Sequence, residues 1–175
     1  MHRFVDMTDG KQGFAILNTG IREYEAMDTA ERPLAITLLR TFVFRQSPII
    51  DRWDVYPDME MSQCPGRHEW TYAIYPHKGD WTSGVFEQAE ALNLPLELAQ
   101  AGAHEGTLPK SMSFVELSGA NLQVTALKMA EDGSSYLVRL FNPTDKGAIG
   151  TLKVFKEIKH AWLTNLNEER QRELQ

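Results

Sequence analysis

The alternation of apolar and polar positions predicts β-strands along most of this chain. From residue 69 to residue 74 the two kinds alternate, and Trp70, Tyr72 and Ile74 share one side. A period of two is typical of a strand with one face against a core. Pro76 has no N–H to donate to a neighbouring strand, so we expect the strand to end there.

A second apolar stretch follows Pro33 and predicts a long strand over residues 34–44. Its even positions are all apolar except Arg40, which falls on the same predicted face. A charge inside a packed core costs several kcal/mol unless it is paired. Arg40 is therefore expected to meet a carboxylate, to be turned outward by a bulge, or to line a cleft.

Turn signals predict the remaining strands. Asn18-Thr19-Gly20 separates residues 14–17 from residues 21–26 and favours a hairpin between them, and Asp132-Gly133 favours a hairpin between residues 122–129 and 136–141. Further strands are expected over residues 114–117 and 151–155, and irregular connections over residues 45–62 and 99–110.

Two segments have helical features. Val85, Phe86, Ala89 and Leu92 recur at helical spacing, and Asp80 precedes them as a candidate cap. Near the end, Asn165 and Glu168 have the spacing of a capping box, but few apolar residues accompany them, so a helix there would gain little from burial. The whole pattern predicts a mainly all-β fold: one antiparallel β-sandwich or supersandwich domain over residues 1–175, with one short internal helix.

Net charge, apolar runs and cysteine content limit which partners and which cellular location the sequence favours. The net charge of −6 disfavours nucleic acid, and no apolar run has the length of a membrane span. We expect neither nucleic acid nor membrane as a partner. Cys64 is the single cysteine, so no internal disulfide is possible and a cytoplasmic location fits best.

Residues that could carry chemistry are scattered. The five histidines lack the short spacings of metal ligands, and no G-x-S-x-G motif occurs, so we predict no catalytic residue, no metal site and no cofactor within this chain. His77, beside Asp80, is expected in a turn, where a turn-stabilising role is favoured over catalysis. Glu23 and Glu25 are either a carboxylate pair for sugar hydrolysis or a solvated strand edge.

Loop aromatics leave a second pair of alternatives. Trp53, Tyr56, Tyr75 and Trp81 lie in or next to predicted loops. Such rings can stack on sugars, or they can cover a core at the ends of a sheet, where they bury a large area.

Three segments together resemble the C-terminal β-sandwich region of glycoside hydrolase family 38 α-mannosidases, in particular the bacterial type. They are RFVDMTDGKQGFAILNTGIREYEA followed by LAITLLRTF, then QCPGRHEWTYAIYPHKGDW, and finally YLVRLFNPT followed by EIKHAWLTNLNEE. They occur in the order expected for that family and span nearly the whole chain.

The resemblance implies an accessory role. Members of the family are zinc-dependent retaining α-mannosidases, and their nucleophilic aspartate and zinc ligands lie in an N-terminal catalytic domain that has no counterpart here. The implied chain is a C-terminal region, cut at both ends, that is inactive alone. Its implied partners are that catalytic domain and an α-mannoside, and zinc is expected in the catalytic domain.

The resemblance also singles out Arg40. In LLRTF it matches an arginine that can approach the sugar site from the β region in family members, and the apolar surface around it is expected to dock on the catalytic domain. Trp53, Tyr56 and His77 complete the set of candidate substrate-binding residues. A stand-alone carbohydrate-binding module that uses Trp53 and Tyr56 is the main alternative. A structural sandwich that assembles as an oligomer is another.

Overall fold

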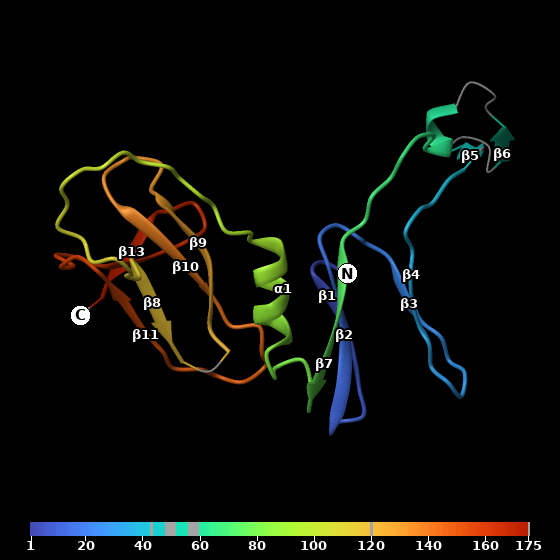
Figure 1. Ribbon diagram of the computed structural model, residues 1–175, viewed down its shortest axis with the longest axis horizontal. Helices are drawn as coiled ribbons and strands as arrows, with labels where there is room; N and C mark the ends of the chain where they lie inside the picture. The colour runs from blue at the N-terminus through green and yellow to red at the C-terminus, as the bar shows by residue number, and fades with distance from the viewer. Residues whose placement is uncertain (43, 48–51, 56–59, 120, 175) are drawn as a thin grey trace. The chain divides into compact units, whose positions relative to one another are not determined.

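The computed structural model describes residues 1–42, 44–47, 52–55, 60–119 and 121–174, and in these ranges the chain is built mainly from antiparallel strands. It divides into two compact units, Met1–Gln100 and Ala101–Gln175, which are described separately. All the strand pairs in the described ranges are antiparallel. The mainly all-β class with one short helix is confirmed (Figure 1). A single domain over residues 1–175 stays a prediction.

The first unit is organised around a three-stranded sheet. Its strands are β1 (Phe4–Thr8), β2 (Gln12–Asn18) and β7 (Tyr72–Lys78), in the order β1-β2-β7. A tight turn at Asp9-Gly10 joins β1 to β2: the Asp9 carboxylate accepts the backbone N–H groups of Lys11 and Gln12, and Gly10 has a positive φ of 85°. These hydrogen bonds lower the pKa of Asp9.

One face of this sheet, called here the inner face, packs against helix α1 (Val85–Asn93). Ala15, Leu17, Val85 and Ala89 are buried together, and Phe4, Ala73, Tyr75, Trp81 and Leu92 pack around them. Arg3 forms an ion pair with Glu90 of the helix, which ties the start of the chain to it. The core of the unit therefore lies between α1 and the sheet.

The helix is confirmed, but its predicted cap is wrong. The residue before the helix is Gly84, in a left-handed conformation and without a side-chain cap. Asp80 instead accepts hydrogen bonds from the backbone N–H and the hydroxyl of Thr82, within the turn that precedes the helix. Asp80 is too far ahead of the first helical N–H groups because the turn intervenes.

The predicted core face of the middle strand is wrong. Tyr72 and Ile74 are exposed, whereas Ala73, Tyr75 and His77 lie on the inner face. Pro76 does not end the strand, because β7 is an edge of the sheet and a proline is tolerated at an edge. Trp70 precedes the strand.

The remaining strands of the first unit are short hairpins. β3 (Tyr24–Ala26) pairs with β4 (Leu34–Ile36), and β5 (Phe44–Ser47) pairs with β6 (Arg52–Val55), ahead of a 3₁₀ helix at Glu60–Gln63. Residues 21–26 therefore do not pair back onto β2, whose two edges are taken by β1 and β7. The long strand over residues 34–44 and the wholly irregular segment 45–62 are likewise wrong, because the chain forms two local hairpins there.

The second unit consists of three antiparallel pairs. β9 (Gln123–Met129) pairs with β10 (Tyr136–Phe141), β8 (Val115–Ser118) with β11 (Thr151–Val154), and β12 (Trp162–Thr164) with β13 (Arg170–Glu173). The hairpin at Asp132-Gly133 is confirmed, as are the predicted strands around it and the irregular segment 99–110. The possible C-terminal helix is wrong: Asn165 accepts the N–H groups of Asn167 and Glu169 and closes a β-hairpin instead.

Candidate functional site

Arg40 lies on the surface, in the irregular segment after β4. Its Nη1 atom is 3.0 Å from Glu23 Oε1, and both side chains are largely exposed. The Thr37 N–H also donates to the Glu23 carbonyl oxygen, which holds the two segments together. Of the three expectations for Arg40, the meeting with a carboxylate is the one observed.

The surroundings of Arg40 are apolar and open. Leu38, Leu39 and Phe42 flank it, and each is more than two-fifths exposed. Glu23 is committed to Arg40, and Glu25 lies exposed in β3. The two glutamates therefore form a solvated edge rather than a buried catalytic pair.

His77 occupies a very different place. It lies in β7 and not in a turn, so that expectation is wrong, and its side chain is only 1% exposed. Its Nε2 atom is 2.7 Å from the carboxylate of Asp6 in β1, and the Asp6 side chain is 8% exposed. The Tyr75 ring stacks on the imidazole with 6.2 Å between ring centroids. A sugar cannot reach His77 in this conformation.

Gly13 explains how His77 and Asp6 meet across the central strand. Asp6 pairs with Ala15 and His77 with Gly13, so all four residues lie on the inner face. A Cβ atom on Gly13 would lie 2.7 Å from His77 Cε1 and 2.7 Å from the Met7 carbonyl oxygen. Glycine at this position therefore leaves the space through which the imidazole reaches Asp6. Sequence reasoning missed this group, although Asp6 and Gly13 both belong to the first family-like segment.

Of the two aromatic candidates, Trp53 and Tyr56, the structure describes only the backbone of Trp53. Trp53 lies in β6 opposite Gln46, and its side chain is outside the described part. Tyr56 lies outside the described residues. Among the described residues, Arg40 pairs with Glu23 and His77 with Asp6, and no hydrogen bond or ion pair joins Arg40 to His77. The role of these four candidates in substrate binding stays a prediction.

Of the two alternatives for the loop aromatics, stacking on a sugar or covering the core, Tyr75 and Trp81 show the second. Both pack against the buried cluster between α1 and the sheet. They therefore cover the core and do not form an open stacking platform.

A charged cluster in the second unit links two hairpins. The Lys128 ammonium lies 2.6 Å from Glu131 and 2.7 Å from Glu168, and Glu168 also accepts the Glu131 backbone N–H. The hydrogen bonds from Lys128 and Glu131 lower the pKa of Glu168, and those to Glu131 and Glu168 raise the pKa of Lys128. The arrangement joins the β9–β10 turn to the β12–β13 turn.

Two further kinds of feature, clusters of metal ligands and membrane-spanning helices, are missing from the described ranges. These ranges contain no group of three or more His, Cys, Asp or Glu side chains placed to hold a metal ion. Helices there also lack the length and apolarity that crossing a membrane requires.

Comparisons with known proteins point to one class. Residues 121–175 match the glycosyl hydrolases family 38 C-terminal beta sandwich domain. A putative mannosylglycerate hydrolase of Halalkalibacterium halodurans is 32% identical over 149 residues, which is 84% of this chain and 16% of that protein. Alpha-mannosidase 2C1 of Mus musculus is 29% identical over 174 residues, or 97% of this chain and 15% of that protein.

Solved structures agree. An alpha-mannosidase from Enterococcus faecalis matches 98% of this chain with a TM-score of 0.82 and 26% identity, and the match takes up 18% of that chain. These observations define an antiparallel β region of a glycoside hydrolase. Residues 121–175 belong to the C-terminal β-sandwich domain of glycoside hydrolase family 38, and the chain spans about a sixth of the length of these two curated relatives.

Proposed function

We propose that this chain is the accessory β region of an α-mannosidase, which buttresses a catalytic domain that hydrolyses α-mannosides. The observation that carries the proposal is the match of nearly the whole chain to less than a fifth of a solved α-mannosidase. A region that keeps its fold within a much longer enzyme has a structural part in that enzyme. In this reading the chain has no hydrolytic activity alone.

The catalytic machinery is assigned to the polypeptide that accompanies this region. We assign the zinc ion and the nucleophile to an N-terminal catalytic domain, and the resemblance to family 38 supports this assignment. The catalytic domain and the α-mannoside are then the partners of this chain, and an oligomer of the enzyme is compatible with this role. The single cysteine, Cys64, supports a cytoplasmic location.

Arg40 is the residue of this chain that we assign to the substrate pocket. It is exposed, it keeps donors beyond the one used with Glu23, and it lies among exposed apolar residues that suit a docking surface. A guanidinium that reaches a sugar hydroxyl from a docked β region adds a charge-assisted hydrogen bond. Trp53 and Tyr56, in and beside the β5–β6 hairpin, are kept as secondary candidates.

The proposal is tested by comparing the isolated chain with the α-mannosidase that, under this proposal, contains it together with the catalytic domain. That protein is called here the longer enzyme. An aryl α-mannoside is supplied with zinc, and the bound zinc is measured after dialysis. We expect turnover and bound zinc in the longer enzyme, and neither stoichiometric zinc nor turnover in the isolated chain. Measurable turnover by the isolated chain rejects the accessory role.

A further inference from the structure

The face of the β1-β2-β7 sheet that points away from α1, called here the outer face, is unevenly covered. Val5, Ile16 and Ile74 form one cross-strand row on this face. Val5 is half-buried and Ile16 is 8% exposed, whereas Ile74 is 66% exposed. Tyr72, the neighbouring outer-face residue of β7, is 51% exposed. Other parts of the unit therefore cover the outer face over β1 and β2 but leave it exposed over β7.

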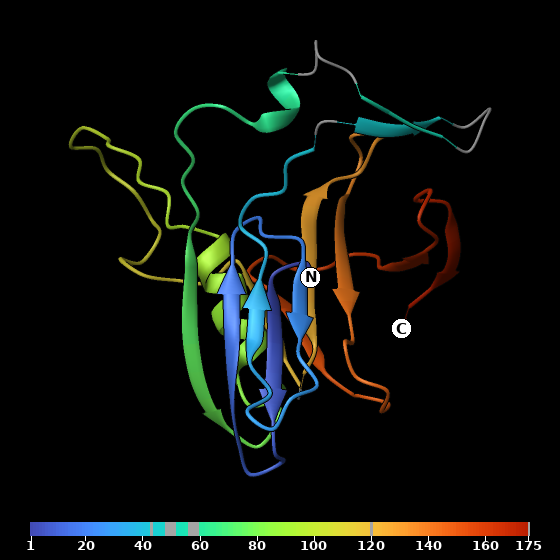
Figure 2. The same cartoon turned by 90° about the vertical axis from the view of Figure 1, so that its right-hand side faces the viewer.

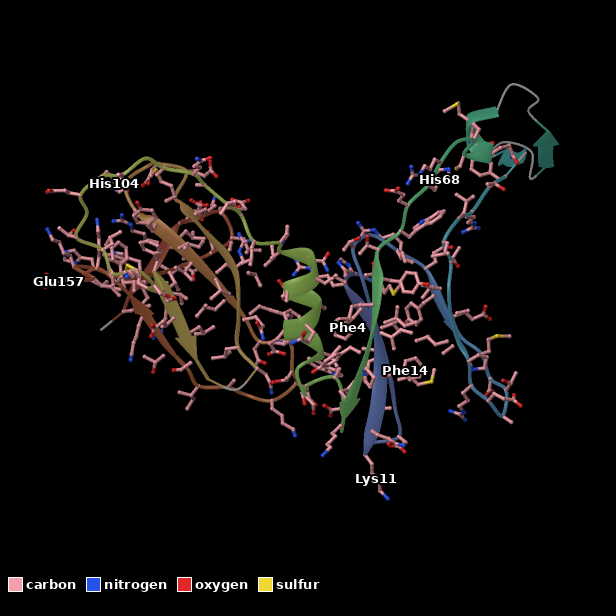
Figure 3. The ribbon with its side chains drawn as sticks, in the orientation of Figure 1. Phe4, Lys11, Phe14, His68, His104 and Glu157 are labelled. Carbon is pink, nitrogen blue, oxygen red and sulfur yellow. The ribbon has the colours of Figure 1, made fainter. Side chains whose placement is uncertain are left out.

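The β3–β4 hairpin provides the cover that exists. In Figures 1 and 2 it forms a second layer beside the outer face, and Figure 3 shows Phe14 pointing from β2 toward this layer while Phe4 points toward α1. Leu34 and Ile36 of β4 are half-buried and Ala35 between them is exposed, so the apolar side of the hairpin faces the sheet. A layer of two strands thus lies over a sheet of three.

The second edge of β4 has no partner strand among the described residues. The Met27 N–H donates to the Pro33 carbonyl, and the Thr37 N–H donates to the Glu23 carbonyl. Hydrogen bonding to one neighbour alternates along an antiparallel strand, so the N–H groups of Leu34 and Ile36 point away from β3. In the described ranges β4 pairs with β3 alone, and in Figure 2 it lies on the β7 side of the hairpin.

The free edge of β7 is a poorer place for a further strand. Pro76 lies in the middle of that edge and has no N–H to offer. A strand added beside β4, in contrast, finds two outward N–H groups and lies over Ile74 and Tyr72. One additional strand would therefore both pair with the free edge of β4 and cover the exposed side chains of Ile74 and Tyr72.

We propose that a β-strand from the same enzyme, outside these 175 residues, pairs with the free edge of β4 and covers Tyr72 and Ile74. The inference rests on the proposed function. The solved relatives hold this fold within chains of which it makes up about a fifth, so further polypeptide accompanies it there. A second copy of this chain is disfavoured, because two side chains and a three-residue edge fall well below the roughly 1,200 Å² of a stable interface. A tethered strand needs less area, because its effective concentration is high.

The cover is tested by thiol labelling in a Cys64→Ser background, which removes the one native cysteine. Ile74→Cys reports on the outer face. Lys11→Cys, at the tip of the β1–β2 turn, is the control (Figure 3). In the isolated chain both thiols should react with maleimide at similar rates. In the longer enzyme the Ile74→Cys thiol should react at least tenfold more slowly, and the Lys11→Cys thiol should be unchanged.

Strand pairing is tested separately by amide hydrogen exchange. The Ile36 N–H should exchange at least tenfold more slowly in the longer enzyme than in the isolated chain, whereas that of Ala35, which faces β3, should change little. Equal Ile74→Cys labelling in both proteins overturns the inference. So does protection of Ile74→Cys without protection of the Ile36 amide, because the cover is then no strand. Protection in the isolated chain that grows with its concentration identifies a second copy instead.

Mannosidase activity of the same samples separates the two proposals. An active enzyme with a reactive Ile74→Cys thiol rejects the added strand alone. An inactive enzyme with a protected thiol and a protected Ile36 amide rejects the mannosidase role alone.

Discussion

At the scale of single residues, the contact between the buried side chains of His77 and Asp6 leaves little room for change. It depends on Gly13, where any side chain meets His77 and the Met7 carbonyl. We predict that Gly13→Ala destabilises the unit by about 1–3 kcal/mol, the usual cost of overpacking. Urea unfolding followed by tryptophan fluorescence measures the change. Gly20→Ala is the matched control, since a Cβ there has no neighbour within 4 Å; equal stability of the two variants contradicts the prediction.

Arg40 carries a functional prediction at the same scale. In the longer enzyme, Arg40→Ala should raise KM for an aryl α-mannoside about tenfold or more, because a hydrogen bond involving a charged group is worth about 1.5–3 kcal/mol. Arg67→Ala is the control: Arg67 is also exposed, in the same unit, and pairs with Glu69. Steady-state kinetics distinguish the two, and an equal effect of both substitutions removes Arg40 from the pocket.

Sequence reasoning handled these two residues unequally. The charge of Arg40 on an apolar stretch left three outcomes open, a carboxylate partner, an outward turn at a bulge or a cleft, and the structure shows the carboxylate of Glu23. The partner of His77 could not be predicted, because it depends on the register that places Asp6 and His77 on either side of Gly13. A register is a property of three strands together and leaves little trace in any one of them.

At the scale of elements, Glu168 holds the last hairpin to the β9–β10 turn. We predict that Glu168→Gln weakens the ion pair with Lys128 and speeds amide exchange in β12 and β13 at neutral pH. Hydrogen exchange read by mass spectrometry gives the effect. Glu157→Gln, in an exposed loop of the same unit, is the control and should leave these amides unchanged.

The same cluster has a defined pH dependence. The pKa of Glu168 in the folded chain lies below its ordinary value of 4.5, because Lys128 and the Glu131 N–H bind its charged form. Its contribution to stability is therefore complete above that ordinary value and is lost as the pH falls through the lowered folded pKa. Protection of β12 and β13 should fall in this acid range in the native chain, and Glu168→Gln should lack that step. Identical acid profiles contradict the assignment.

Local signals predicted some elements well and failed where packing decides. Asp132-Gly133 specifies its turn by backbone preference alone, and the hairpin follows. The apolar stretch after Pro33 looked like one long strand, but only Leu34–Ile36 pairs with β3, because β3 offers a short partner, and Phe44 belongs to a separate hairpin. The capping-box spacing at Asn165 proved to be a hairpin turn, since the same side chain can close either structure.

At the scale of the whole molecule, three features of the first unit fit the proposal that other polypeptide completes this region. The bare β7 residues, the open edge of β4 and the apolar surroundings of Arg40 all lie in the first unit. A module that evolved to bind sugars by itself would carry its affinity in this chain. A buttress that contributes one hydrogen bond to a shared pocket cannot offset the entropic cost of holding a sugar alone.

Calorimetric titration of the isolated chain with mannose oligosaccharides tests this claim most directly. An accessory region should give no saturable heat up to millimolar sugar. Saturable binding with a defined stoichiometry contradicts the accessory role and establishes a stand-alone carbohydrate-binding module instead.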